Sequence, residues 1–188
     1  GIEAALAAAR MGENTLLITQ TLDSIGRLSC NPSIGGISKG NIVREIDALG
    51  GEKGKLADAS MIQYRLLNKS RGPAVQAPRV QADKFLYSQL AKHAVELEEK
   101  LHIFQDTVCN IVSSNTNEAG YVECGEVQCV KTERGRTFSA KAVVLTTGTF
   151  LEGKIYIGEY EAADGRLGEG RCRFGSCTCT KRIYYGAA

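Results

Sequence analysis

The residues best suited to chemistry lie at positions 29–40, where a cysteine precedes an Asn-Pro turn, a glycine pair and a lysine. Asn-Pro favours a turn, so Cys30 is expected on a loop. Gly35 and Gly36 would let a ligand approach the backbone closely, because no Cβ intervenes. Backbone N–H groups, a helix start and Lys39 would stabilise a neighbouring thiolate. The pattern predicts a reactive site beside a bound ligand, whereas an inert buried thiol is the alternative for Cys30 taken alone.

Length and composition describe an ordinary globular protein. The chain has 188 residues, with 23 basic, 21 acidic and 43% apolar residues, which suffices for one domain with a core, or a domain plus a fragment. The near balance of charge gives no case for nucleic-acid binding from composition alone. No apolar run approaches the roughly 20 residues of a membrane span, and the first residues lack a secretory pattern. Seven irregularly spaced cysteines predict reduced thiols in a cytoplasmic protein.

The first twenty residues predict half of a βαβ unit. Residues 1–10 are strong helix formers, Gly12 stands at the position of a C-terminal cap, and residues 15–19 form a short apolar run typical of a buried parallel strand. Gly1 would then be the last glycine of a phosphate-binding turn, with the first strand missing. A helix that merely starts at a truncated end is the alternative. Gln20 stands where a ribose-binding carboxylate is usual.

Three more helices are expected before residue 100. Ser38 would cap the first, which carries Ile42, Val43, Ile46 and Leu49 on one face. The second covers residues 55–68 and leads into a basic loop. The third covers residues 81–100, and its predicted apolar stripe consists of Phe85, Leu86, Leu90, Ala94 and Leu97.

The second half of the chain changes to strands. Residues 102–104, 107–112, 121–132 and 136–139 predict short strands, with an antiparallel meander around the turn at residues 133–135. Residues 142–148 predict a buried strand that ends in Thr147, Gly148 and Thr149. The carboxyl end of a parallel strand is where open α/β sheets bind ligands.

Several blocks together resemble the tRNA uridine 5-carboxymethylaminomethyl modification enzyme family, known as MnmG or GidA. They include GIEAALAAARMG (1–12), LSCNPSIGGISKG (28–40), REIDALGG (44–51), GPAV (72–75) and VLTTGTFL (144–151). The resemblance runs from Gly1 to about Glu169. It implies an α/β, Rossmann-like FAD-binding domain of the glutathione-reductase type, interrupted by an antiparallel β-meander and lacking its first strand. Residues 1–169 would be a partial FAD-binding domain.

The resemblance also implies a reaction and its participants. With a GTPase partner, MnmE, the family adds a (carboxymethyl)aminomethyl group to C5 of the wobble uridine of tRNA. FAD is the bound cofactor, NADH the reductant and methylene-tetrahydrofolate the carbon donor, and the full-length protein is a homodimer. No membrane association is implied. The sibling folate- and FAD-dependent tRNA uridine methyltransferase is an alternative, as is a non-catalytic fragment that binds tRNA or dimerises.

Site residues follow from the same resemblance. Cys30 matches the family cysteine that attacks the uracil ring or handles the transferred carbon. The implied FAD contacts are Gly1, Gly35, Gly36, Val108, Thr147, Gly148 and Thr149. Lys39, Arg71 and Arg79 are candidates for phosphate contacts, and solvated surface positions are the alternative for each. His93 and His102 have no partners that would make a catalytic triad.

Residues 170–188 leave the family pattern, which predicts a divergent tail that is frameshifted or disordered. Cys172, Cys177 and Cys179 have irregular spacing and no nearby histidine, so no metal site is predicted. The family's second cysteine, its NADH region and its helical domain are not found in these residues. The fragment alone is therefore expected to be inactive and to hold FAD poorly.

Overall fold

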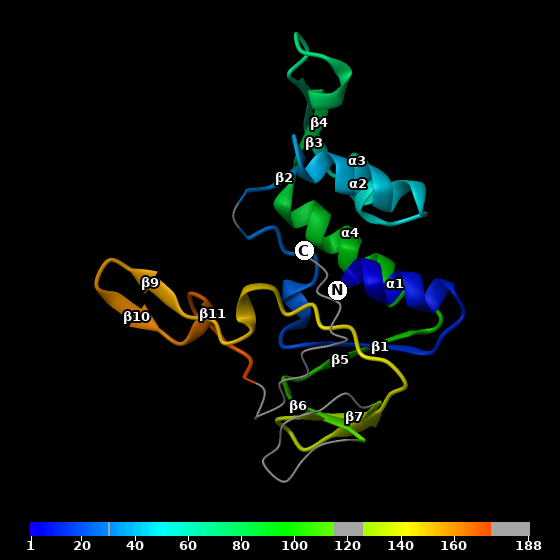
Figure 1. Ribbon diagram of the computed structural model, residues 1–188, viewed down its shortest axis with the longest axis vertical. Helices are drawn as coiled ribbons and strands as arrows, with labels where there is room; N and C mark the ends of the chain where they lie inside the picture. The colour runs from blue at the N-terminus through cyan, green and yellow to red at the C-terminus, as the bar shows by residue number, and fades with distance from the viewer. Residues whose placement is uncertain (30, 115–125, 174–188) are drawn as a thin grey trace. The chain divides into compact units, whose positions relative to one another are not determined.

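The computed structural model describes residues 1–29, 31–114 and 126–173. Contacts between residues divide the chain into two compact units. Figure 1 labels their helices and strands. The helical unit consists of residues 2–17 and 21–103, and the strand unit consists of Gly1, residues 18–20 and the residues from Phe104 onward. The boundary crosses β1 (Thr15–Thr19) and β5 (Leu101–Gln105), which pair as a two-stranded sheet.

The helical unit combines helices with a small antiparallel sheet. Its helices are α1 (Ile2–Arg10), α2 (Lys39–Ala48), α3 (Lys53–Ala59) and α4 (Lys84–Glu96). Its sheet has the order β2–β4–β3, formed by β2 (Ser33–Gly35), β3 (Met61–Leu67) and β4 (Ala77–Ala82). Short 3-10 turns lie at Leu22–Ser24 and Pro73–Val75.

Helix α1 packs through two alanines and a leucine. Ala5, Leu6 and Ala9 are buried and share a core with Val95 of α4 and Leu101 of β5. Gly12 has a φ of +97°, and its N–H donates to the Ala9 carbonyl at 2.9 Å, which ends the helix as a glycine cap does. The helix predicted for residues 1–10 and the strand predicted for residues 15–19 are therefore confirmed. The predicted burial of that strand is wrong, because none of its residues is buried and Leu16 is 37% exposed.

A second core lies under the three-stranded sheet. Ile34 and Val80 are direct cross-strand neighbours and point to the same buried face. The remaining buried members of this core are Leu56, Ala57, Ala82, Tyr87 and Ala91. Successive residues of a strand face opposite sides of the sheet. Residues next to Ile34 and Val80 in the sequence, such as Arg79 and Gln81, therefore lie on the outer face.

The prediction of one helix over residues 55–68 is wrong. Helix α3 ends at Ala59, and Met61–Leu67 forms β3. Residues 61–67 pair with β4, for example Tyr64 with Val80 and Leu66 with Pro78. Pairing across the sheet satisfies a full row of backbone groups, and this outweighs the weak helical preference of the segment.

The third predicted helix begins later and buries a different face. Strand β4 occupies the start of the predicted range, and Asp83 caps α4 by accepting hydrogen bonds from the N–H groups of Phe85 (2.9 Å) and Leu86 (3.0 Å). Tyr87, Ala91 and Val95 are buried at a spacing of four residues. Phe85 is 83% exposed and Leu97 is 67% exposed, so the predicted apolar stripe is not the packed one.

The helix that follows the glycine pair at residues 35–36 is present as predicted, but its predicted apolar face is not fully packed. Helix α2 covers Lys39–Ala48, and the side chain of Ser38 makes no capping hydrogen bond. Val43 packs against the second core, whereas Ile42 is 55% exposed and Leu49 is 89% exposed. The predicted apolar face is thus only partly used among the described residues.

The strand unit contains antiparallel hairpins. Strands β6 (Val108–Ser113), β7 (Val127–Thr132) and β8 (Thr137–Ser139) form one sheet in that order, with a turn closed by the Gly135 N–H on the Thr132 carbonyl at 3.0 Å. Two further hairpins pair β9 (Ile155–Ile157) with β10 (Tyr160–Ala162) and β11 (Asp164–Arg166) with β12 (Glu169–Gly170).

Residues 142–148 do not form the predicted buried strand. Residues 142–147 are irregular, and a 3-10 turn covers Gly148–Phe150. Leu145 is buried, but Val144 is 51% exposed. A buried parallel strand requires neighbours that pair with its backbone, and the described part of the chain supplies none for this segment. Among the described residues, no helix is long and apolar enough to span a membrane.

Candidate functional site

The glycine pair after β2 forms a turn that requires glycine. Gly35 and Gly36 have φ values of +96° and +105°, and the Gly36 N–H donates to the Pro78 carbonyl at 2.9 Å. A Cβ on Gly35 would overlap the Pro78 oxygen, whereas a Cβ position on Gly36 has no atom within 4 Å. The space at Gly36 is therefore open, which a close approach of a ligand to the backbone requires. The contact of Gly36 with a ligand stays a prediction. Cys30 lies outside the described residues, and its role stays a prediction.

Two predicted phosphate-contact residues converge on one serine. The Lys39 Nζ donates to the Ser33 carbonyl at 3.3 Å, and the Arg79 Nη2 donates to the Ser33 Oγ at 3.1 Å. Ser33 stands opposite Gln81 in the sheet, next to the glycine turn. Both cations are thus held beside that turn by neutral acceptors, and neither forms an ion pair within the described residues. Arg71 lies elsewhere, at the tip of the β3–β4 hairpin.

Lys53 is a further cation that the sequence did not single out. It begins α3, its side chain is partly buried, and its pKa is lowered by burial and by the positive charge of Lys39, against the opposing charge of Glu3. A lysine in the first turn of a helix opposes the helix dipole, where acidic residues are usual. That local mismatch is the signal that would have found it. Two mutually repelling lysines make the surroundings favourable for an anion.

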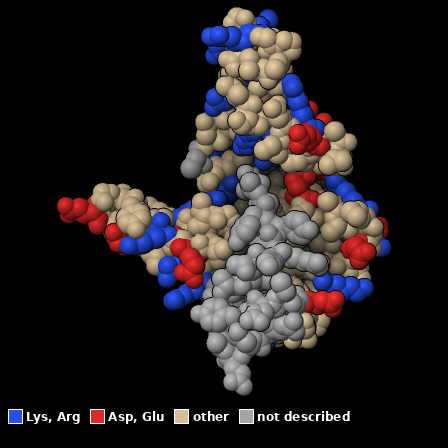
Figure 2. All heavy atoms as spheres, in the orientation of Figure 1, with Lys and Arg blue, Asp and Glu red and all other residues tan. Residues whose placement is uncertain are grey.

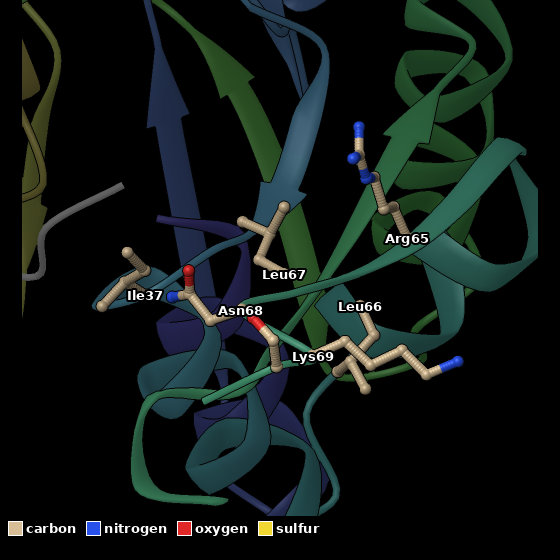
Figure 3. Close-up of a pocket in the computed structure, with 7 residues that line it drawn as sticks. Ile37, Arg65, Leu66, Leu67, Asn68 and Lys69 are labelled. Atoms are coloured by element: carbon tan, nitrogen blue, oxygen red, sulfur yellow. The ribbon is translucent and has the colours of Figure 1, made fainter. Parts of the chain in front are cut away.

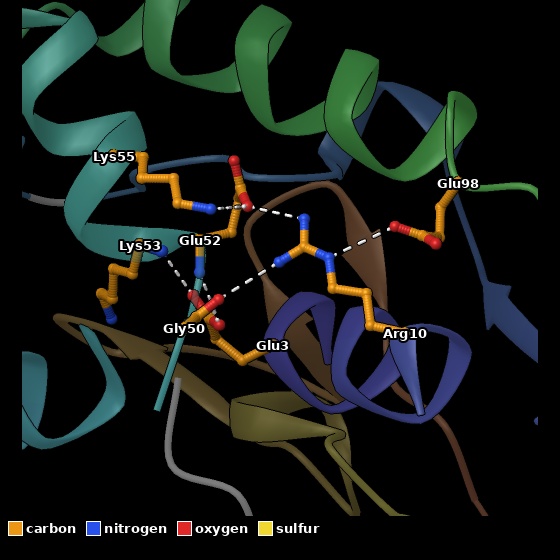
Figure 4. Close-up of polar contacts among 7 residues, drawn as sticks. All are labelled: Glu3, Arg10, Gly50, Glu52, Lys53, Lys55 and Glu98. Atoms are coloured by element: carbon orange, nitrogen blue, oxygen red, sulfur yellow. Dashed lines mark hydrogen bonds and ion pairs between the residues drawn. The ribbon is translucent and has the colours of Figure 1, made fainter. Parts of the chain in front are cut away.

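Glu3 connects two helices near these lysines (Figure 4). From the first turn of α1, its carboxylate accepts hydrogen bonds from the backbone N–H groups of Glu52 at 3.0 Å and Lys53 at 2.6 Å. It therefore supplies the cap that α3 lacks, because the Glu52 side chain makes no capping bond of its own. A Cβ on Gly51 would stand 2.9 Å from the Glu3 Oε2, so the Gly-Gly sequence leaves room for this contact.

Arg10 fixes the other end of α1 in the same network (Figure 4). Its guanidinium donates to Glu52 at 2.7 Å, to Glu98 at 3.3 Å and to the Gly50 carbonyl at 3.3 Å. The hydrogen bond that Arg10 donates to Glu52 is the main reason that the pKa of Arg10 is raised. These contacts join the end of α1 to residues just before α3 and just after α4. Because Glu3 holds the start of α1, the helix that follows Gly1 is fixed at both ends.

The remaining predicted FAD contacts lie in the strand unit. Val108 begins β6, opposite Thr132. Thr147 precedes the 3-10 turn that contains Gly148 and Thr149. Gly148 has a φ of +56° and no atom within 4 Å of its Cβ position. The Thr149 Oγ1 donates to the Gly165 carbonyl at 3.1 Å. This hydrogen bond fixes the turn, and the space beside Gly148 stays open.

The described cysteines do not form a metal or redox centre. Cys109, Cys129 and Cys172 are free thiols, and burial raises the pKa of Cys172. No cluster of three or more metal-binding side chains occurs within the described residues. Cys177 and Cys179 lie outside the described residues. Residues 170–173 are packed, since the Cys172 N–H donates to the Phe150 carbonyl at 2.9 Å and the Glu152 N–H donates to the Cys172 carbonyl at 3.0 Å.

Comparisons with known proteins agree with the family resemblance seen in the sequence. The chain is 88% identical over 169 residues to a protein of Treponema denticola named tRNA uridine 5-carboxymethylaminomethyl modification enzyme MnmG, covering 90% of this chain and 27% of that protein. A protein of the same name from Treponema pallidum is 76% identical over the same length and shares. The structure of Aquifex aeolicus GidA superposes with a TM-score of 0.84 at 51% identity, covering 92% of this chain and 27% of that one.

These relatives share the α/β fold that the sequence predicted. The chain spans about a quarter of the length of the curated relatives that it matches. The family model described as glucose inhibited division protein A matches residues 1–180. With the glycine turn, the helix behind Gly1 and the Thr-Gly-Thr turn all present in this chain, the chain belongs to the glucose inhibited division protein A family.

Proposed function

We propose that this chain forms part of an FAD-dependent enzyme that modifies the wobble uridine of tRNA. The observation that carries the proposal is the 88% identity, over 90% of the chain, with a protein named for tRNA uridine 5-carboxymethylaminomethyl modification. Because the chain spans 27% of that relative, the complete activity belongs to a longer protein. This chain would supply part of its cofactor-binding region.

The residues present fit an FAD molecule. Gly36 and Gly148 each combine a positive φ with an open Cβ position, which is what close approach of a ligand to the backbone requires. Gly1 precedes α1, and the amino end of a helix favours a pyrophosphate. Gly35, Val108, Thr147 and Thr149 would complete the contacts. When bound, FAD would supply the oxidation–reduction chemistry.

Cys30 is the proposed nucleophile. Its thiolate would add to C6 of the uracil ring, which makes C5 nucleophilic toward the carbon to be transferred. Later loss of the C5 proton and of the thiolate would restore the aromatic pyrimidine and the free cysteine. Lys39, which the structure anchors on Ser33 at the start of α2, adds positive charge to the same loop.

The other participants follow from family membership and are part of the proposal. They are NADH as reductant, methylene-tetrahydrofolate as carbon donor, the GTPase MnmE as partner, and a second copy of the full-length protein. The Cys30-to-Gly36 block favours this reaction over uridine methylation by the sibling folate-dependent enzyme. Cytoplasmic localisation would accompany a tRNA substrate.

A chimera tests the function. The matching segment of the Treponema denticola relative is replaced by this chain, and the gene is expressed in a host that lacks its own enzyme. Nucleoside analysis of the host tRNA should show restored wobble-uridine modification, and Cys30→Ser should abolish it. Cys109→Ser, which alters a free thiol on β6, is the matched control and should leave modification intact. Restored modification in the Cys30→Ser chimera would remove Cys30 from the mechanism.

Cofactor retention is tested on the same proteins. The purified chimera should carry a flavin absorption band at near-stoichiometric occupancy. The 188-residue chain by itself should carry little or none, because it holds only part of the site. A chimera that modifies tRNA without any flavin would overturn the FAD assignment.

A further inference from the structure

One part of the helical unit carries positive charge without any acidic residue. The chain as a whole has 23 basic and 21 acidic residues, yet residues 24–44 and 59–82 contain no Asp or Glu. These two segments contain the three strands of the β2–β4–β3 sheet, the connection between β3 and β4, and the start of α2. Their cations are Arg27, Lys39, Arg44, Arg65, Lys69, Arg71 and Arg79. Such segregation in a nearly neutral chain indicates a surface selected for a polyanion.

Two of these arginines stand directly opposite one another. Arg65 of β3 pairs with Arg79 of β4, and like charges at opposed positions destabilise a sheet. With Gln63, Leu67 and Gln81 they line a cavity of about 180 Å³ on the outer face. Within the described residues, neither arginine forms an ion pair, and Arg79 donates only to the neutral Ser33 Oγ. A bound anion would supply the counter-charge that the sheet lacks.

The tip of the hairpin extends this surface in an ordered form. The Asn68 Nδ2 donates to the Val75 carbonyl at 3.0 Å, and the Gln76 Nε2 donates to the carbonyls of Lys69 (3.3 Å) and Arg71 (2.9 Å). Asn68 adopts a φ of +54° within this turn. Because side-chain hydrogen bonds fix the loop backbone, Lys69 and Arg71 are presented from a built turn.

A wider groove of about 610 Å³ runs from Arg65 toward the tip. Ile37 and residues 65–70 line it. In Figure 3 the Arg65 and Lys69 side chains extend away from the ribbon with their nitrogens apart, while Ile37, Leu66 and Leu67 add apolar surface. Figure 2 shows blue cations over the hairpin tip at the top of the view, with no acidic side chain there. On such a surface the cations can contact the phosphates of a nucleic-acid strand, and the apolar side chains can contact its bases.

The occupant must be extended. Strand β3 has seven residues and so spans about 23 Å, with Arg65 near its middle and Lys69 and Arg71 beyond its end. A single phosphate or a dinucleotide would neutralise only one end of such a surface. Successive phosphates of one RNA strand would reach all of it.

We propose that the surface formed by Arg65, Lys69, Arg71 and Arg79, here called the hairpin surface, binds the backbone phosphates of an RNA strand. The choice of RNA, and of tRNA as its source, rests on the proposed function. The arginine pair, the ordered tip and the acid-free segments stand independently of that choice. Gln63 and Gln81, which line the same cavity, offer amide groups to base edges.

Binding of a labelled tRNA transcript to the 188-residue chain tests the proposal. Fluorescence anisotropy is measured between about 50 and 200 mM KCl, where each lost phosphate contact on a single strand lowers the slope of log K against log salt by about 0.7. Arg65→Gln/Arg79→Gln should therefore lower the slope by about 1.4 and weaken binding at low salt roughly tenfold or more. Arg65→Lys/Arg79→Lys should keep the slope.

Controls separate the hairpin surface from general charge and from misfolding. Lys84→Gln/Lys92→Gln removes the same charge from α4 and should keep the parental slope. The glutamine variant should melt no lower than the parent, because it relieves a repulsion. Equal losses in both double variants, or no tRNA binding by the parent, would overturn the proposal. Displacement of tRNA by excess FAD would do the same, since it would assign the surface to the cofactor.

The two proposals fail in different ways. A chimera that restores wobble modification, combined with parental tRNA binding by the hairpin variant, would refute the hairpin surface and keep the proposed function. A chimera that restores nothing, combined with a reduced salt slope in the hairpin variant, would refute the proposed function and keep an RNA-binding surface.

Discussion

The carbonyl oxygen of Pro78 occupies the space in which a side chain on Gly35 would have to begin. Gly36, the next residue, has an equally unusual φ but open space at its Cβ position. The pair therefore separates two reasons for glycine. Gly35 is required by packing of β2 on β4, whereas Gly36 is required by backbone conformation and by access.

Gly35→Ala should destabilise the protein by roughly 2–5 kcal/mol, since backbone strain and an overlap add. Gly36→Ala should cost about 1–2 kcal/mol, from backbone strain alone. Urea unfolding of both variants and the parent measures the difference. Equal costs for the two variants would contradict the distinction between packing and access.

Glu3→Ala should destabilise the protein by about 1 kcal/mol, the usual cost of losing a helix cap, because the N–H groups of Glu52 and Lys53 lose their acceptor. Glu3→Gln should cost less, since its amide oxygen still accepts. Glu13→Gln, which changes an exposed carboxylate after α1, is the control for the loss of charge. Thermal unfolding at neutral pH would refute the capping role if Glu3→Ala and Glu13→Gln matched.

Asp106 should make stability depend on acid pH. Burial alone would raise its pKa, but the neighbouring Thr132 side chain, a hydrogen bond from the Thr107 N–H (2.8 Å) and Arg134 hold the pKa below its ordinary value. The Arg134 Nε lies 3.2 Å from the Asp106 Oδ2, in ion-pair contact without hydrogen-bond geometry. A carboxyl with a lowered pKa contributes stability above its unfolded pKa of about 4, and this contribution is lost as pH falls through the folded value.

Melting temperatures measured from neutral to strongly acidic pH test this. The parent should exceed Asp106→Asn at neutral pH, and the gap should close as the pH falls below about 4. Asp58→Asn, which changes an exposed carboxyl on α3, should show a small gap throughout. A constant gap between parent and Asp106→Asn would show that packing, and not ionisation, is responsible.

Lys53→Met should raise the melting temperature at neutral pH. Burial and the charge of Lys39 lower the pKa of Lys53, so its protonated form is less favourable in the folded state than in the unfolded state. The stability of the parent should therefore rise as pH increases through the folded pKa, and the advantage of the variant should shrink. Lys55→Met, which breaks an exposed contact with Glu52, is the control and should bring no gain. A fall in melting temperature for Lys53→Met would contradict this.

Sequence reasoning identified what depends on local chemistry. The helix over residues 1–10, the strand over residues 15–19, the glycine turn and the turn at Gly135 each need only their own residues to be recognised. The family resemblance was confirmed because those local blocks are specific. Asp83, which was included in a helix, is instead its cap.

The predictions that were wrong concern elements whose structure depends on residues distant in the sequence. Residues 61–67 form a strand because β4 pairs with them, and nothing within the segment announces that pairing. Helix α4 buries Tyr87, Ala91 and Val95 because the sheet and α1 lie on that side, although Phe85 and Leu97 are more apolar by type. Lys53 escaped notice because its significance lies in its burial and in its neighbour Lys39.

Strand β3 has consequences for handling the protein as well as for binding. It is an edge strand in the order β2–β4–β3, and Met61 (45% exposed), Ile62 (69%) and Tyr64 (57%) lie on it. Exposed apolar edges recruit further strands, and charged residues such as Arg65 oppose this. Neutralising Arg65 should therefore promote strand-to-strand self-association, which light scattering at increasing protein concentration would detect. The residue that attracts a polyanion is also the one that keeps the chain from adding to itself.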